Sequence, residues 1–170
     1  MDAMKAILSR RSIRKYTAQA VPDEVITDLL KAAMSAPSAS NQQPWQFVVV
    51  NDRQLLDEIP DIHPYSKMLK EAAVAVLVCG DQRSEKSKGF WVQDCSAATQ
   101  NLLLAAHATG LGAVWLGIYP NQERVAKFQK KFGLPEGITP LALISIGYPA
   151  EEKPPSDRYD PARVRYNRWS

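Results

Sequence analysis

Arginine and serine side chains are concentrated near the start of the chain, in the run Ser9-Arg10-Arg11-Ser12-Ile13-Arg14-Lys15-Tyr16. Guanidinium groups bind phosphate oxygens in pairs, and serine hydroxyls add further hydrogen-bond donors. If the run is extended, Arg10, Ser12 and Arg14 point to one side of it. The run therefore predicts a site for a phosphate ester. The alternative interpretation is a solvated basic turn, or arginines that pair with acidic neighbours.

A second polar segment, residues 36–45, reads Ala-Pro-Ser-Ala-Ser-Asn-Gln-Gln-Pro-Trp. It lies between a predicted helix and a predicted buried strand. Pro37 and Pro44 restrict its path, and its small side chains permit the close approach of a ligand. Its amide groups and hydroxyls could bind a flat polar heterocycle. The alternative is an ordinary connecting loop, because Ser, Asn and Pro are typical loop residues.

Several well-known catalytic motifs are absent from the sequence. Gly110-Leu111-Gly112 follows a predicted helix and precedes a predicted strand, which is the reverse of the dinucleotide-binding arrangement. There is no phosphate loop, HExxH zinc motif or GxSxG nucleophile motif. The only histidines are His63 and His107, and we interpret His107 as a hydrogen-bonded helix residue. We therefore expect no metal site and no catalytic acid, base or nucleophile, which argues against hydrolases, zinc enzymes and kinases.

The composition is that of one globular domain, residues 1–170, with 45% hydrophobic and 23% charged residues. The net charge is +3, and the basic residues gather mainly at two places, Lys5 to Lys15 and Arg158 to Arg168, so we expect no nucleic-acid partner. Two cysteines form no disulfide framework, and no apolar run is long enough to span a membrane. We expect a cytoplasmic protein without a membrane partner. A chain of this length would need a second copy to enclose a large ligand.

Apolar spacing predicts the elements that must position the two polar segments. Four helices are expected, over residues 2–9, 22–36, 90–109 and 121–132, with brief helical pieces at 55–59 and 67–71. Four strands are expected, over residues 47–50, 74–79, 114–116 and 141–146. These strands are apolar without alternation, so helices should cover both faces of the sheet. Residues 151–170 are rich in proline and charge and predict an extended tail.

The helix over residues 90–109 is apolar nearly all round. A helix with so little polar surface must be covered on more than one side. We interpret this pattern as packing against the same helix of a second copy, and the alternative is burial within the core of one chain.

Together, the arginine–serine run and residues 37–45 resemble the nitroreductase family of FMN-dependent oxidoreductases. Further matches are Gly-Leu-Gly-Ala-Val-Trp-Leu-Gly at residues 110–117 and Gly147-Tyr148-Pro149, so the resemblance covers essentially the whole chain. It implies an α+β fold with three layers, α/β/α, around a central mixed sheet of four to five strands. It also implies a homodimer whose extended C-terminal tails are exchanged between the two copies.

The resemblance further implies that FMN lies at the dimer interface. Arg10, Ser12 and Arg14 would hold its phosphate, and Arg11 would reach the phosphate or the ribityl chain. Arg158 of the tail would meet the phosphate across the dimer. Pro37, Ser38 and Ala39 would line the flavin, while the stretch from Ser40 through Asn41 to Gln43 would reach the partner's cofactor. Lys67 corresponds to a lysine near the pyrimidine edge, and Leu116 and Gly117 would offer backbone groups near flavin N5 and O4.

The implied activity is a hydride transfer from NADH or NADPH, through flavin N5, to a small electron-poor acceptor such as a nitroaromatic or a quinone. The cycle would be ping-pong, and the flavin carries the chemistry, so no catalytic side chain is required. Two alternatives remain: a flavin-binding protein for storage or sensing, and a family member with a specialised reaction such as reductive dehalogenation. Larger members roof their substrate site with inserted helices, so this shorter chain predicts a wide, permissive site.

Overall fold

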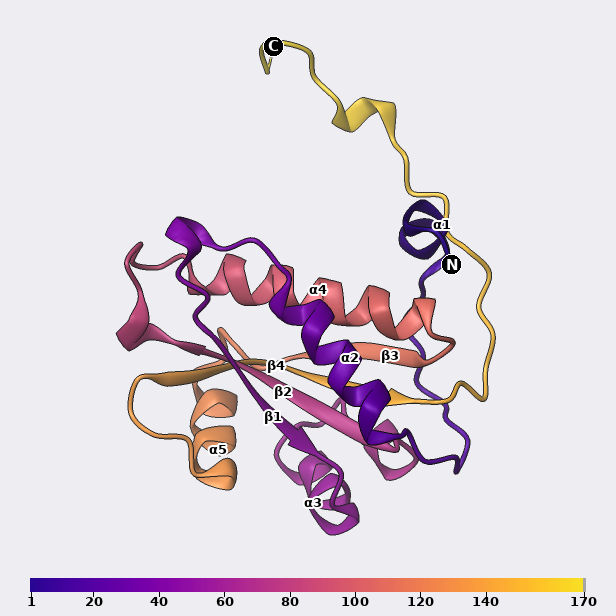
Figure 1. Ribbon diagram of the computed structural model, residues 1–170, viewed down its shortest axis with the longest axis vertical. Coiled ribbons are helices and arrows are strands. Elements are labelled where there is room, and N and C mark those ends of the chain that lie inside the picture. Colours follow the sequence, from indigo (N-terminus) through magenta and orange to yellow (C-terminus); the bar gives the residue numbers. More distant parts are fainter. Residues whose placement is uncertain (170) are drawn as a thin grey trace.

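A four-stranded antiparallel sheet forms the centre of the computed structural model, which describes residues 1–169 (Figure 1). Its strands lie in the order β1, β2, β4, β3, with bounds Trp45–Val50, Val74–Asp81, Ile138–Gly147 and Gly112–Gly117 respectively. Every predicted apolar run lies inside one of these strands. The four strand predictions are therefore correct in position and too short at their ends.

The prediction of a mixed sheet is wrong, because no two strands pair in parallel within residues 1–169. All three ladders are antiparallel, and the parallel pairing found within residues 1–169 is a single bridge between Ser12 and Ala113. These residues supply four strands and no fifth. Unbroken apolar strands are typical of parallel sheets. Here the same pattern arises because helices cover both faces of an antiparallel sheet.

Helices on the two faces create two hydrophobic cores. On one face lie α2 (Asp23–Met34) and α4 (Trp91–Ala108), which pack against side chains such as Val76 and Ile144. On the other lie α3 (Arg53–Glu58) and α5 (Gln122–Phe132), together with short 3-10 turns at Ile59–Asp61 and Lys67–Lys70. Leu77, Leu143 and Phe128 are buried there. The expected three-layer α/β/α arrangement is confirmed.

Local sequence signals explain where several helices begin and end. Asp2 accepts a hydrogen bond from Lys5 N at the start of α1 (Ala3–Ser9), and Asn121 caps α5 in the same way. Gly133 ends α5 in the left-handed conformation, with φ of 59°. The predicted helix ends differ from the observed ones by only one or two residues. No helix within residues 1–169 is long and apolar enough to cross a membrane.

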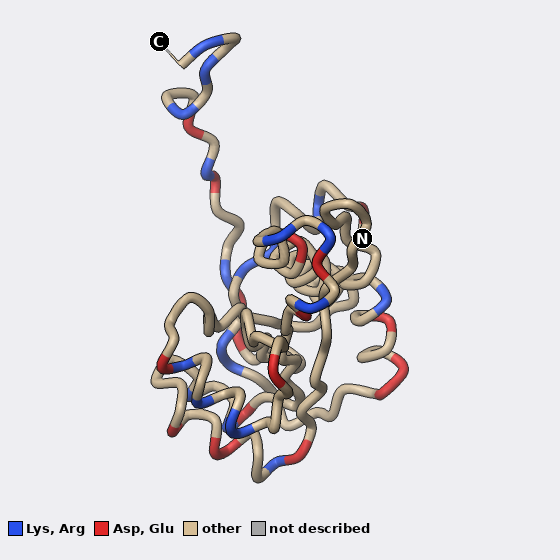
Figure 2. The backbone as a smooth tube through the Cα atoms, turned by 90° about the vertical axis from the view of Figure 1, so that its left-hand side faces the viewer, with Lys and Arg blue, Asp and Glu red and all other residues tan. Residues whose placement is uncertain are grey.

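Two segments protrude from this body. Helix α1 lies near the C-terminal end of α4 and exposes Met4, Ile7 and Leu8, each more than half accessible (Figure 1). Residues 151–169 leave the body as an extended tail with one short turn, Pro161–Arg163. Figure 2 shows this tail projecting outward with basic residues spaced along it. Its Tyr166 and Trp169 side chains are exposed, so the chain leaves two apolar surfaces uncovered.

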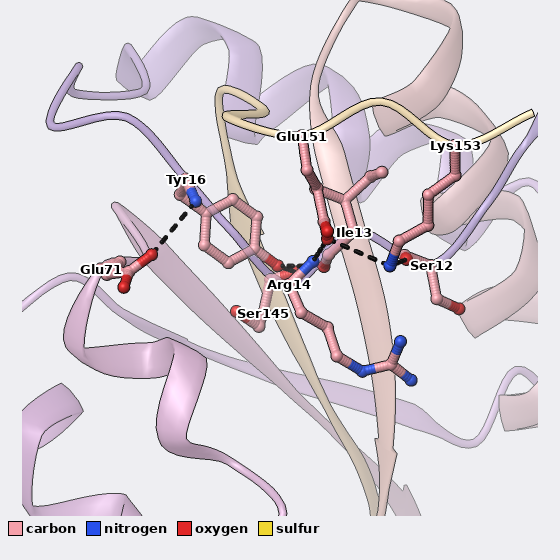
Figure 3. Close-up of polar contacts among 8 residues, drawn as sticks. All are labelled: Ser12, Ile13, Arg14, Tyr16, Glu71, Ser145, Glu151 and Lys153. Carbon is pink, nitrogen blue, oxygen red and sulfur yellow. Dashed lines mark hydrogen bonds and ion pairs between the residues drawn. The ribbon is translucent and has the colours of Figure 1, made fainter.

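The arginine–serine run is extended, which is the conformation assumed when its alternate residues were assigned to one side. It lies beside the edge of β3. Ile13 N donates to Ala113 O at 3.1 Å, and Tyr16 forms an isolated antiparallel bridge with Pro149. The buried Tyr16 hydroxyl lies 2.8 Å from Ile13 O and 3.2 Å from Ser145 O (Figure 3). Burial raises the pKa of Tyr16, so the hydroxyl keeps the proton that it donates. Tyr16 therefore attaches the run to the sheet.

We expect Tyr16→Phe to lower the free energy of unfolding by about 1–3 kcal/mol, because buried carbonyls lose their donor. Urea denaturation followed by fluorescence measures the change. Tyr119→Phe is the matched control, since the Tyr119 hydroxyl makes no hydrogen bond within residues 1–169 and its loss should cost less than about 0.5 kcal/mol. Equal losses in the two variants would contradict the role given to Tyr16.

Candidate functional site

Three guanidinium groups come together where α1 ends. Arg10 follows α1 directly and is half-buried. Burial lowers its pKa, and the positive charges of Arg158 and Arg11 lower the pKa further. None of the three forms an ion pair within the part of the chain that the structure describes. A cavity of about 520 Å³ lies between Arg10 and the tail, and Gln100, Ser156 and Arg158 also line it. Asp157 also lines the cavity, but the two arginines leave an excess of positive charge there, which favours an anion.

The predicted phosphate-binding residues do not all face this cavity. The Ser12 hydroxyl makes no hydrogen bond within residues 1–169, while its carbonyl accepts from Lys153 Nζ at 2.8 Å. Arg11 donates instead to Pro154 O and lines a neighbouring cavity beside His107. Arg14 lines a third cavity with Leu116 and Gly117. The structure therefore brings Arg158 beside Arg10 of the same chain, where the resemblance had implied an approach from the partner, and it separates Arg14 from both.

Hydrogen bonds join the arginine–serine run to the first residues of the C-terminal tail. Arg14 N donates to Glu151 Oε1 at 2.6 Å, and Lys153 Nζ lies 3.1 Å from the same carboxylate oxygen (Figure 3). The backbone hydrogen bond from Arg14, then burial and Lys153, shift the pKa of Glu151, and the net direction is downward. The Arg14 guanidinium points away from Glu151 and forms no ion pair within residues 1–169 (Figure 3). Its charge remains available to a ligand.

The edge of β3 presents unpaired backbone groups between these cavities. In an antiparallel pair, successive residues direct their N–H and C=O groups alternately toward and away from the neighbouring strand. Ile118 N donates to Leu141 O across the pair, whereas Ala113 O accepts from Ile13 on the opposite side. The N–H groups of Trp115 and Gly117 therefore face the open edge. Gly112 to Gly117 spans about 17 Å of this edge.

The cavity at the end of this edge, named here the Gly117 cavity, has a volume of about 450 Å³. It is lined by Arg14, His63, Tyr65, Met68, Trp115, Leu116, Gly117 and Arg124. Gly117 O accepts hydrogen bonds from His63 Nε2 at 3.0 Å and from Arg124 Nη1 at 2.6 Å. A Cβ atom added at Gly117 meets no atom within 4 Å, so the chain's own packing does not require glycine there. The open backbone suits a flat group that must approach closely.

The sequence predicted Lys67 and not His63 as a site residue, but Lys67 lies outside the lining of the Gly117 cavity and His63 lies within it. Lys67 is exposed on the turn Lys67–Lys70, and its neighbour Met68 lines the Gly117 cavity while Lys67 does not. The sequence assigns His63 no role, but in the structure His63 is buried and lies against Gly117 O. Burial lowers the pKa of His63, and the nearby Arg124 charge lowers it further. The hydrogen bond to Gly117 O opposes this shift of the pKa, and because a carbonyl only accepts, His63 Nε2 is the donor.

The second polar segment is a strained loop held by one buried carboxylate. Ser40, Asn41 and Gln43 have φ angles of 50°, 50° and 47°, which is uncommon outside glycine. Asp94 Oδ1 accepts from Ala39 N at 2.9 Å, and Asp94 Oδ2 accepts from Gln42 Nε2 at 2.6 Å. Sequence reasoning missed Asp94 and the buried Gln42. A single carboxylate in the first turn of an otherwise apolar helix was the available signal.

Helix α4 places this loop far from the guanidinium groups of the same chain. The loop is bonded to Asp94 in the first turn of α4, whereas His107 in its last turn lies 2.7 Å from Ser9 Oγ. Thirteen residues at about 1.5 Å each separate the two ends by roughly 20 Å. Pro37, Ser38, Ala39, Ser40, Asn41 and Gln43 thus lie at the opposite end of α4 from Arg10 and Ser12 (Figure 1). The contact with Ser9 confirms His107 as a hydrogen-bonded helix residue.

Comparison with known proteins places this arrangement in a family. The sequence profile of the nitroreductase family matches residues 7–63 and 62–148. The chain belongs to the nitroreductase family. A curated nitroreductase-family relative from Methanothermobacter thermautotrophicus, provisionally named an NADH dehydrogenase/NAD(P)H nitroreductase, is 51% identical over 99% of this chain and 88% of its own. One from Archaeoglobus fulgidus with the same provisional name is 45% identical over 99% of both chains.

Solved structures of nitroreductase-like proteins agree with the fold. A Clostridium acetobutylicum protein, provisionally named an NADH oxidase, superposes with a TM-score of 0.93 at 42% identity, covering 96% of this chain and 99% of its own. A provisionally named nitroreductase of Desulfovibrio desulfuricans, solved in complex with FMN, has a TM-score of 0.83 at 34% identity, covering 99% of this chain and 98% of its own. The nitroreductase fold is therefore shown for this chain.

We expect Asp94→Asn to destabilise the strained loop, because one carboxylate oxygen becomes a donor that faces another donor. The free energy of unfolding should fall by about 1–3 kcal/mol, and limited proteolysis should cleave residues 38–43 faster. Asp28→Asn on exposed α2 is the control, since Asp28 pairs only with Lys31 on the surface. Unchanged proteolysis of the loop in Asp94→Asn would contradict this role.

Proposed function

We propose that this chain is an FMN-dependent NAD(P)H oxidoreductase whose FMN lies along the open edge of β3. The proposal rests on one observation above the others: guanidinium groups crowd around Arg10 near one end of this edge, and an exposed glycine with an outward N–H stands at the other. The names of the relatives and the FMN complex of the Desulfovibrio protein support it.

The residues of the edge fit the two ends of the cofactor. Arg10, Ser12 and Arg158 would bind the phosphate, because a dianion relieves the repulsion among cations and accepts charge-assisted hydrogen bonds. Leu116 and Gly117 would lie against the flavin ring, where the Gly117 N–H offers a donor. Arg14 belongs to the ring end in this arrangement and not to the phosphate. Its positive charge there favours the uptake of electrons by the ring.

The remaining site residues would come from a second copy of the chain. The strained loop cannot reach the phosphate end of its own chain, because α4 separates them by roughly 20 Å. A homodimer in which the loop of one chain covers the flavin of the other brings Ser38 to Gln43 into the site. The exposed apolar side of α1 and the aromatic tail supply contact surface for such a dimer, with the tails exchanged.

FMN would supply the redox chemistry here, a hydride transfer through flavin N5 between NADH or NADPH and an electron-poor acceptor. The chain's own residues bind, orient and charge-stabilise the cofactor. The Gly117 cavity is open to solvent and would admit donor and acceptor in turn, as a ping-pong cycle requires. Nitroaromatics and quinones are acceptors of suitable size.

The visible spectrum of the purified protein tests this function. We expect flavin absorption bands, rapid anaerobic bleaching by NADH or NADPH, and reoxidation by a nitroaromatic or a quinone. Arg10→Ala should lose most of the flavin with the fold intact, while Arg83→Ala, which removes a surface arginine paired with Asp81, should keep it. A flavin that neither nicotinamide bleaches would contradict the enzyme and favour a storage or sensing protein.

A hybrid dimer tests whether two chains share each site. We expect the Arg10→Ala and Asn41→Ala homodimers each to lose most of their flavin. Co-expressed with different tags and purified as a hybrid, the two chains form one site with both defects and one with neither. The hybrid should therefore bind about half of the wild-type flavin. A hybrid that binds only the average of its two parents would show that each chain builds its site alone.

A further inference from the structure

Arg124 is held in a fixed position at the mouth of the Gly117 cavity. It lies in the first turn of α5, where Arg124 N donates to the capping Asn121 Oδ1 at 2.9 Å. Its Nη1 donates to Gly117 O at 2.6 Å, and its guanidinium carbon lies 6.0 Å from the centroid of the Tyr65 ring. The guanidinium is therefore placed between a backbone carbonyl and an aromatic face.

Arg124 forms no ion pair among the described residues, although the Glu123 carboxylate is near enough to feel its charge. Within residues 1–169, no carboxylate lies within 4.0 Å of it, whereas Lys127 and Lys131 on the same helix pair with Glu123 and Glu58. Arg14 adds a second unpaired cation to the same cavity. The lowered pKa of His63 favours its uncharged form. Because none of the residues that line this cavity is acidic, the cavity is positive.

The other walls are flat and apolar. The Tyr65 ring is 71% exposed and lines the cavity together with Trp115 and Met68. The cavity has a volume of about 450 Å³ in the chain alone, and a flavin ring beside Gly117 would share this space with a small ligand of one ring. The combination of aromatic walls and a guanidinium at the mouth matches an aromatic ring that carries a carboxylate.

We propose that the Gly117 cavity is a subsite for aromatic carboxylates, with Arg124 as the residue that determines this specificity. The inference deepens the proposed function, because it names the class of acceptor at the same site. An acceptor whose carboxylate meets Arg124 lies beside Gly117, where the flavin ring is proposed to lie. For a nitrobenzoate, one turnover oxidises one NAD(P)H and reduces the nitro group to a nitroso group, taking one proton from solvent and releasing one water.

Binding of matched compounds tests the subsite without turnover. Calorimetry on the oxidised protein as purified compares 4-nitrobenzoate with the uncharged 4-nitrobenzamide, which has nearly the same shape. We expect the carboxylate to bind about tenfold more tightly, since a charge-assisted hydrogen bond to a guanidinium is among the stronger contacts. In Arg124→Gln this preference should fall to within about twofold.

The control is Lys127→Gln, which removes one positive charge from the same helix at a residue paired with Glu123 outside the cavity. Its preference for the carboxylate should match that of the wild-type protein. Equal binding of the two compounds to the wild-type protein, or an undiminished preference in Arg124→Gln, would overturn the subsite. The same loss in both variants would assign the preference to the general charge of α5 and overturn the role of Arg124.

Flavin reduction is read separately, so the two proposals can fail independently. A protein that binds 4-nitrobenzoate selectively through Arg124, but whose flavin is not bleached by NADH or NADPH, retains the subsite and loses the oxidoreductase. A protein that reduces 4-nitrobenzamide and 4-nitrobenzoate with equal kcat/KM and binds them equally retains the oxidoreductase and loses the subsite.

Discussion

The rigid length of α4 is the constraint on which the arrangement of polar residues depends. Its core face is buried against the sheet through residues such as Ala98 and Leu102, so the helix cannot shorten or tilt without opening the core. Asp94 at one end holds a strained loop, and His107 at the other contacts the end of α1. Helix α4 thereby keeps the strained loop of one chain apart from the arginine residues that follow α1. A shared site between two chains is the simplest way to combine them.

The elements of the fold could be predicted because their signals are local. Four apolar runs became strands, and the 3.6-residue spacing located the helices to within one or two residues. Strand direction could not be derived in this way, because burial on both faces removes the alternation that distinguishes an antiparallel sheet. The mixed sheet was wrong for this reason.

The candidate site was harder to predict, because its residues meet only when segments distant in the sequence come together. Alternation along the run predicted Arg10 and Arg14 on one side, but Arg10 lines a cavity beside the tail and Arg14 lines the Gly117 cavity. Asp94 and Arg124 act through contacts with residues 55 and 7 positions away in the sequence. Neither belongs to a motif. Only the folded chain shows that Asp94 supports the loop and that Arg124 faces Gly117.

The edge of β3 also bears on whether another chain can pair with this sheet. An exposed edge strand is a template for pairing with another chain, and long open edges lead to aggregation. Here Ser12 and Ile13 cover one end of β3, while His63 and Arg124 occupy the carbonyl at the other. The stretch left uncovered between them is too short to begin a ladder of hydrogen bonds. The same residues that outline a binding edge thus keep that edge from recruiting a foreign strand.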